Sequence, residues 1–148
     1  MERKSSRKLK IDKNYTPCPV AEGDEFYPNG IFVFNITKII EFIDSHPDIF
    51  TPEYIDVKGQ YGNFLSINES YMSKVKLSNP VILGEIAPGR FNLIDGQHRM
   101  EKAHRMGIKK IKAYKVHVEY LQQFLTDEKA YIAHIEYWNG KLNEKVSI

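Results

Sequence analysis

The sequence predicts an α/β (α+β) fold with a small mixed sheet and flanking helices. The first observation is a pair of apolar runs, over residues 80–86 and 90–96, separated by a Pro-Gly turn. The second is that a helix-like segment over residues 97–106 and an alternating apolar–basic run over residues 108–116 follow directly. Strands that alternate with a helix in this way are typical of a small α/β domain.

Length and composition predict one domain. The chain has 148 residues, of which 42% are apolar and 27% are charged, as in an ordinary globular protein. Residues 1–14 are polar, charged and aperiodic, which predicts a flexible basic arm before a single domain over residues 15–148. No apolar run approaches the roughly 20 residues that span a bilayer, and no signal peptide is evident. The single cysteine, Cys18, allows no internal disulfide, so we expect a cytoplasmic protein without a membrane partner.

The first half of the chain predicts a strand and a helix. Residues 15–30 hold three prolines and two glycines and predict irregular structure. The apolar run over residues 30–36 predicts a strand, and isoleucines at 36, 39, 40 and 43 then have helical spacing. Asn35 or Thr37 could cap this helix, and Pro47 marks its end.

Residues 48–79 are less periodic. The segment over residues 54–67 predicts two short strands joined across Gly59 to Gly62. The segment over residues 68–77 predicts a short helix with Asn68 or Ser70 near its start. The sequence assigns no role to residues 48–77.

The second half of the chain predicts more regular elements. Pro80 opens a hairpin over residues 81–94, and Gly107 is placed to end the next helix in a left-handed conformation. The run over residues 108–116 predicts a half-exposed strand. Apolar residues from Leu121 onward predict one or two amphipathic helices, with Asp127 as a cap for the second.

Charge is unevenly distributed although the net charge is only +2. Residues 1–10 carry a net charge of +4 and residues 90–115 carry +6, whereas residues 11–89 carry −6 and residues 116–148 carry −2. The basic segments are typical either of solvated surface or of a site for an anion, a nucleotide phosphate or a nucleic acid backbone.

The turn Asp95-Gly96-Gln97-His98-Arg99 is the strongest candidate site. A strand that turns directly into a helix often needs φ values that Gly96 adopts at low cost. The first amides of the helix lack backbone partners and, with the helix dipole, favour an anion. Arg99 can add a bidentate contact to a phosphate, and His98 can donate or accept a hydrogen bond. Gly96, His98 and Arg99 therefore predict a phosphate cradle at the start of the helix.

The helix that follows has two faces. At about 100° per residue, Met100 and Ala103 fall on one side and predict packing on a sheet. His98, Lys102 and Arg105 fall on the opposite side. We therefore add Lys102 to the predicted phosphate-binding residues.

Asp95 has several candidate roles. It could simply cap the helix and pair with Arg99 four residues later, which explains the local geometry without a ligand. It could instead be catalytic, or help His98 and Glu101 to hold Mg²⁺ with a nucleotide, although the sequence assigns no metal ligand as such. His104 falls near the packed side and predicts a structural histidine.

The stretch "FNLIDGQHRMEKAHRMGIKKIKAYKV" resembles the signature of the ParB/sulfiredoxin-like superfamily, which includes the ParB N-terminal-like domain. Members share a strand, a Gly-x-x-Arg-like turn, a helix ended by glycine and a further strand. The resemblance covers residues 78–118 and extends loosely back to residue 31. It implies a compact domain that holds nucleotide phosphates at the turn, CTP in ParB partition proteins and an adenine nucleotide in sulfiredoxins and free-serine kinases. By position, Gly96 to Arg99 would bind ATP or CTP, with or without Mg²⁺.

The sequence also departs from these families. Gln97 stands where sulfiredoxins place a catalytic cysteine, which argues against sulfinic acid repair, and Cys18 is remote in sequence. His98-Arg99 replaces the Arg-Arg pair of partition proteins, and the residues after the last strand are too few for their DNA-binding domain. Asp95 matches an Asp at the start of a similar turn in the serine kinases, so a role in phosphotransfer is still a candidate function.

Lys109, Lys110, Lys112 and Lys115 could contact nucleic acid phosphates, or could protect an exposed or edge strand from aggregation, which we favour. Non-specific DNA binding through the basic arm and residues 109–115 is still a candidate interaction.

The sequence thus predicts a nucleotide-phosphate-binding domain of a stand-alone DNA-associated or regulatory protein, prokaryotic or from a phage. The alternatives are a small-molecule kinase or nuclease of the same fold, and an interaction module without a ligand. Neither an NTP-dependent activity nor the oligomeric state is decided by the sequence.

Overall fold

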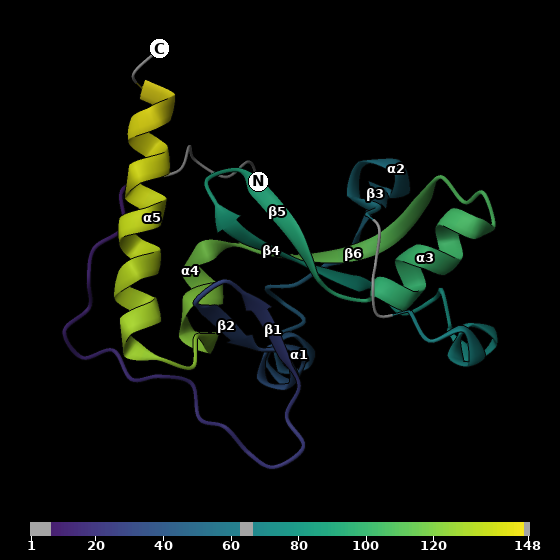
Figure 1. Ribbon diagram of the computed structural model, residues 1–148, viewed down its shortest axis with the longest axis horizontal. Helices are drawn as coiled ribbons and strands as arrows, with labels where there is room; N and C mark the ends of the chain where they lie inside the picture. The colour runs from purple at the N-terminus through teal and green to yellow at the C-terminus, as the bar shows by residue number, and fades with distance from the viewer. Residues whose placement is uncertain (1–6, 63–66, 147–148) are drawn as a thin grey trace.

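The computed structural model describes residues 7–62 and 67–146, which form a four-stranded mixed sheet and a separate two-stranded one (Figure 1). The order in the larger sheet is β3-β6-β4-β5, with β6 parallel to β4 and antiparallel to β3. In chain order the elements are β1 (Phe26–Asn29), β2 (Phe32–Asn35), α1 (Ile36–Ser45), β3 (Glu53–Asp56), α2 (Val57–Gln60), the 3₁₀ helix η1 (Glu69–Lys74), β4 (Val81–Ala87), β5 (Arg90–Asp95), α3 (Gln97–Arg105), β6 (Lys110–Val116), α4 (Val118–Leu121), the 3₁₀ helix η2 (Gln122–Phe124) and α5 (Glu128–Val146). The predicted α/β (α+β) class is confirmed.

Strand β4 lies between two hydrophobic cores. All seven of its residues are buried, because it is an inner strand whose two faces are both covered. Ile82 and Ile86 contribute to a core with α1, α4 and α5, whereas Val81 and Leu83 contribute to a second core with α3. Since successive side chains of a strand point to opposite faces, one apolar run serves both cores. Figure 1 shows α5 at one end of the molecule and α3 at the other.

Several predicted helix and strand ends are confirmed. The side chain of Asn35 accepts a hydrogen bond from the Lys38 amide at 3.1 Å and so caps α1, which ends before Pro47. Gly107 has a φ of +70°, and the Ile108 amide donates to the Ala103 carbonyl at 2.9 Å across the end of α3. The hairpin over residues 81–94 is present as the antiparallel pair β4–β5.

The irregular structure predicted for residues 15–30 is wrong at its end, where β1 pairs with β2. Pro28 is tolerated there because β1 pairs on one side only, so its missing amide hydrogen costs no ladder bond. Of the two strands predicted over residues 54–67, the first is β3, but the chain then forms the helix α2. Much of the second predicted strand falls on residues 63–66, outside the described residues. The helix predicted at residues 68–77 is the 3₁₀ helix η1, with Asn68 as its cap.

Strand β6 is half-exposed, as predicted, but it is not an edge strand. Ile111 and Ala113 are buried, whereas Lys110 and Lys112 are exposed. The edge position belongs to β3, which covers one side of β6 while β4 covers the other. Lys110 and Lys112 therefore lie on an exposed face of the sheet and not at an open edge.

Residues 7–14, part of the predicted arm, lie against α5. The Leu9 amide and carbonyl both bond the side chain of Asn139, at 2.8 and 3.0 Å. The Trp138 indole donates to the Arg7 carbonyl at 2.9 Å, and the Asp12 amide donates to the Tyr131 hydroxyl at 2.9 Å. The prediction of a flexible arm therefore does not extend to residues 7–14. Within the described residues no helix, α5 included, has the length and apolar character needed to cross a membrane.

Helix α5 also carries a buried histidine, His134. Its Nε2 lies 2.8 Å from the Ile86 carbonyl and therefore donates, while its Nδ1 accepts from the Gln122 side-chain amide at 2.9 Å. Burial lowers the pKa of His134 below its usual value, against the opposing effect of the Ile86 carbonyl.

We expect Asn139→Ala to release residues 7–14 from α5, because it removes both hydrogen bonds to Leu9. The free energy of unfolding should fall by about 1–2 kcal/mol. Limited trypsin digestion followed by mass spectrometry should then show faster cleavage after Lys8, Lys10 and Lys13 in the variant. Equal cleavage rates in the two proteins would show that Asn139 does not hold this segment.

We expect acid to destabilise the protein partly through His134. Because the pKa is lowered in the folded state, the unfolded chain binds the proton more tightly, and stability falls as pH drops below the ordinary value of 6.5. Urea titrations between pH 7.5 and 5 should give a smaller pH dependence for His134→Gln, by at most about 1.4 kcal/mol per pH unit. Parallel curves for the two proteins would contradict this.

Candidate functional site

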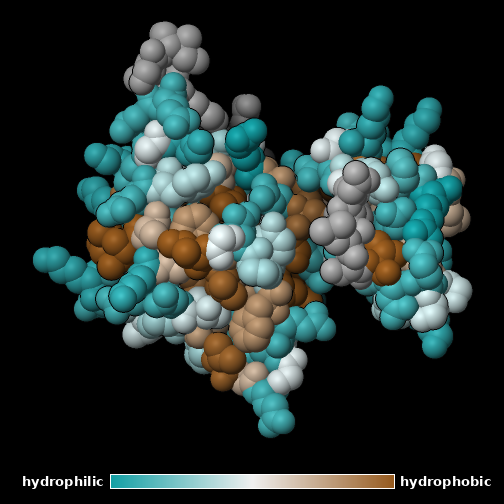
Figure 2. All heavy atoms as spheres, in the orientation of Figure 1, coloured by the Kyte–Doolittle hydropathy of each residue, from teal (hydrophilic) through white to brown (hydrophobic). Residues whose placement is uncertain are grey.

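A cavity of about 860 Å³ opens between α1, the segment over residues 71–80 and the amino end of α3. The space-filling view shows a notch between the part of the molecule that contains α1 and the part that contains α3 (Figure 2). The first core borders the cavity through Ile43 of α1 and Ile82 of β4. The residues that line the cavity are Glu25, Ile40, Ile43, Asp44, Tyr71, Val75, Lys76, Asn79, Pro80, Ile82, Asp95, Gly96, Gln97, His98, Arg99 and Tyr114.

The turn from β5 into α3 forms one side of this cavity. Gly96 has a φ of +104°, and a β-carbon on it would lie 2.6 Å from Cγ1 of Val81. The backbone conformation and this close approach both require glycine. The first helical hydrogen bond runs from the Met100 amide to the Gly96 carbonyl at 2.9 Å. The amides of Gln97, His98 and Arg99 precede that bond, so the helix itself supplies them with no acceptor.

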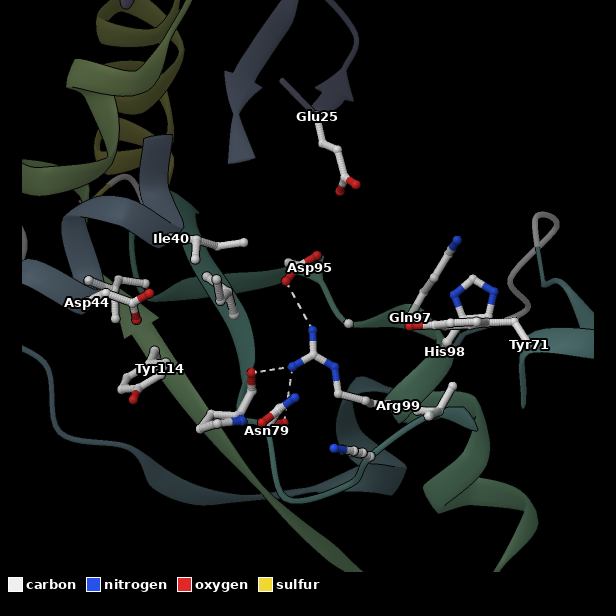
Figure 3. A pocket seen from close by; sticks show the side chains of 16 residues that line it. Glu25, Ile40, Asp44, Tyr71, Asn79, Asp95, Gln97, His98, Arg99 and Tyr114 are labelled. Carbon is white, nitrogen blue, oxygen red and sulfur yellow. Dashed lines mark hydrogen bonds and ion pairs between the residues drawn. The ribbon is translucent and has the colours of Figure 1, made fainter. Parts of the chain in front are cut away.

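Arg99 clamps the two strands of the β4–β5 hairpin at their cavity ends. Its guanidinium contacts the Asp95 carboxylate at 3.0 Å and donates to the carbonyls of Asn79 at 3.1 Å and Pro80 at 2.6 Å (Figure 3). Asp95 makes no capping hydrogen bond to α3, so only the pairing part of its predicted structural role is seen. Arg99 is therefore already bound on three sides before any ligand arrives.

The other basic side chains of α3 hold the segment over residues 68–75. His98 accepts from the Asn68 amide at 3.0 Å through Nε2, which leaves Nδ1 to carry the ring proton. Lys102 donates to the Val75 carbonyl at 2.8 Å. Arg105 makes two hydrogen bonds of 2.7 Å with Glu69, and these lower the pKa of that carboxyl.

The structure brings most of the predicted site residues together. Asp95, Gly96, Gln97, His98 and Arg99 all line the cavity. Figure 3 shows the Gln97 side chain extended beside the His98 ring, on the side away from the α1 residues Ile40 and Asp44.

Two predicted positions lie elsewhere. Lys102 is not among the lining residues, since its ammonium group is directed to Val75. Glu101 is buried and accepts hydrogen bonds from Arg105 at 2.9 Å and from Tyr61 at 3.1 Å, away from the cavity. His104 was predicted to lie near the packed side of the helix as a structural histidine, but it is exposed, and its ring stacks on Tyr61 with ring centroids 3.7 Å apart.

Sequence reasoning missed the far side of the cavity. Glu25 and Asp44 bring two further carboxylates, and Lys76 brings a cation. Ile40 and Tyr114 add apolar surface from α1 and β6. These residues carry no motif and are remote in sequence from the turn, so the sequence held no signal that joins them to it.

The cavity is of mixed charge. Three carboxylates, Glu25, Asp44 and Asp95, face two basic side chains, Lys76 and Arg99, of which Arg99 is paired with Asp95. Within the described part of the chain, no group of three or more His, Cys, Asp or Glu side chains is arranged to hold a metal ion.

The lysines of residues 109–115 are divided between two faces of the sheet. Lys110 lies 3.7 Å from Asp56, while Lys115 contacts Glu53 at 2.8 Å on the opposite face. Lys112 lies over the ring of Tyr54. The predicted basic surface is therefore partly neutralised by the acidic residues of β3.

Comparison of the chain with protein-family models, with curated proteins and with solved structures gives no match. The likeness to the ParB/sulfiredoxin-like superfamily consequently rests on the sequence of the turn and its flanking elements, and stays a prediction.

We expect Arg99→Ala to destabilise the fold, because Asp95 and the Asn79 and Pro80 carbonyls would lose one shared donor. The free energy of unfolding should fall by about 2–3 kcal/mol in urea titrations at pH 7. Glu69→Ala is the matched control, because it removes the exposed contact with Arg105 and leaves Arg105 paired with Glu101, and it should lower the free energy of unfolding much less. Equal losses in the two variants would contradict the clamp.

Proposed function

We propose that the cavity binds a nucleotide, ATP or CTP, with its phosphates at the amino end of α3. The observation that carries this proposal is that the predicted phosphate turn, Gly96 to Arg99, lines a cavity of about 860 Å³, a size suited to such a ligand. A domain of this kind would serve a DNA-associated or regulatory protein. We place that function in the cytoplasm, where nucleotides are abundant and the buried thiol of Cys18 stays reduced.

The phosphate contacts would come from backbone and neutral groups. The amides of Gln97 and His98 lie at the positive end of a helix of nine residues. The Gln97 side chain and the Nδ1–H of His98 can donate further hydrogen bonds. Arg99 contributes by holding Asp95 and the entrance of β4 in place, and not as the principal phosphate ligand.

The base and ribose would occupy the α1 side of the cavity. Ile40 and Ile43 present apolar surface there, and Tyr114 adds an aromatic ring from β6. Asp44 lies beside Ile43 and can accept hydrogen bonds from ribose hydroxyls or from an exocyclic amine. Apolar walls with a few polar groups at one end are typical of cofactor sites.

The charge of the cavity makes Mg²⁺ part of the proposal. Three carboxylates against Lys76 and the paired Arg99 would repel a free triphosphate. A nucleotide that carries its own Mg²⁺ has less negative charge and offers the carboxylates a cation. We therefore expect the Mg²⁺ complex to be the ligand that binds.

Phosphotransfer is the second candidate, and the position of Asp95 favours it. This carboxylate lies in the same cavity as the amino end of α3, and Arg99 fixes its orientation at 3.0 Å. A small hydroxyl-bearing substrate held next to Asp95 would then be a phosphate acceptor. Turnover assays with amino acids, nucleotides and DNA separate this candidate from simple binding.

We expect ATP or CTP with Mg²⁺ to raise the melting temperature of the protein, and the same nucleotide with EDTA to do so much less. Gln97→Glu places an isosteric negative charge beside the phosphates and should weaken nucleotide affinity at least about fivefold in calorimetric titrations. The matched control is Gln123→Glu, the same change at an exposed position outside the cavity, which should bind as the wild type does.

Two outcomes would contradict the proposal. One is a folded wild-type protein whose melting temperature no nucleotide changes, with or without Mg²⁺. The other is an equal loss of affinity in Gln97→Glu and Gln123→Glu, which would mean that binding occurs away from α3.

A further inference from the structure

A strip of alternating basic and aromatic side chains lies on one face of the β3–β6 pair. Lys110, Lys112 and Tyr114 are two residues apart on β6 and so project to the same face, opposite the buried Ile111 and Ala113. Tyr54 of β3 stands directly across from Lys112 in the register. We call Tyr54, Lys110, Lys112 and Tyr114 the outer strip.

The outer strip presents an aromatic ring to solvent. Tyr54 is 64% exposed, far more than a tyrosine that belongs to a core. The Lys112 ammonium lies 5.8 Å from the centre of its ring, near the outer limit of about 6 Å for a cation–π contact. The ring and the lysine are therefore only loosely engaged with each other, and both are accessible to a ligand.

Positive charge exceeds negative charge around this ring. Lys110 and Lys112 are both exposed, and Lys112 stands across from Tyr54 in the register. Asp56 faces Lys110 at 3.7 Å, whereas the other acidic residue of β3, Glu53, points to the opposite face and pairs with Lys115. On this side of the β3–β6 pair, two lysines, Lys110 and Lys112, therefore stand beside one carboxylate, Asp56.

The outer strip is continuous with the cavity. Tyr114 lines the cavity and is also the last residue of the strip. Lys112 and Lys110 follow it on the same face of β6, at every second residue. Successive positions on one face of a strand are about 6.7 Å apart, so the strip forms an extended track and not a closed pocket.

We propose that the outer strip binds single-stranded nucleic acid, with an unpaired base stacked on Tyr54 and the adjoining phosphates on Lys112, Lys110 and their neighbours. An aromatic ring on an open sheet surface with lysines beside it is the combination that unpaired bases and a phosphate backbone require. Duplex DNA would satisfy the lysines but offers Tyr54 no free base face. An acidic peptide would likewise pair with the lysines, but it has no base to stack on Tyr54. This surface goes beyond the nucleotide-binding proposal and does not depend on it.

The test is fluorescence anisotropy with a labelled oligothymidylate and oligouridylate that carry no terminal phosphate. Tyr54→Ala should weaken binding roughly 5- to 150-fold, the loss expected for one stacked base, and Tyr54→Phe should restore it. Lys112→Gln should reduce the slope of log affinity against log salt by about 0.7, as for one phosphate contact on a single strand. The matched control is Tyr137→Ala on α5, which removes a comparable pair, since Lys141 lies 5.6 Å from that ring.

The proposal is overturned if no oligonucleotide binds at low salt, or if Tyr54→Ala and Tyr137→Ala bind alike. Duplex DNA or polyglutamate binding as tightly as the single strand would also overturn it, because stacking would then play no part. Gln97→Glu should leave oligonucleotide affinity unchanged. If nucleotides do not bind the protein, the cavity proposal is contradicted, whereas the proposal for the outer strip is not.

Discussion

The guanidinium of Arg99 is the contact on which the candidate site depends. It joins the end of β5, through Asp95, to the entrance of β4, through the carbonyls of Asn79 and Pro80. Those two points lie side by side at the open end of the β4–β5 hairpin, and the cavity lies beside them. Through these hydrogen bonds the position of residues 79–80 is linked to the helix α3 that carries the guanidinium.

The remaining basic residues of α3 act in the same way farther along the helix. His98 holds Asn68, Lys102 holds Val75 and Arg105 holds Glu69. The positive charge that predicts an anion site is thus largely used to fix the segment over residues 68–80 against α3. What the turn can still offer to a phosphate is backbone amides and neutral side chains, and this is why the cavity is expected to need a cation from its ligand.

The sequence predicted the parts of the fold in which local chemistry and tertiary packing agree. The cap at Asn35, the left-handed Gly107 and the buried strand β4 each have a signal within a few residues. It failed where a distant partner decided the outcome. Pro28 lies in a strand because β1 pairs on one side only, and the exposed His104 finds its partner in Tyr61, which is remote in sequence. The turn at Gly96 was predictable for the same local reason, whereas its facing wall from α1 was not.

The charge of a segment and the charge of a surface are different quantities, and β6 shows why. Lys110, Lys112 and Lys115 are close in sequence, but a period of two sends Lys115 to the opposite face from the other two. The acidic residues of β3 divide in the same way, so Glu53 neutralises Lys115 while Tyr54 stands beside Lys112. A count over residues 109–115 suggests one basic patch. The pleat instead places Lys115 with Glu53 on one face and Lys110 with Asp56 on the other, where Lys112 stands beside the exposed ring of Tyr54.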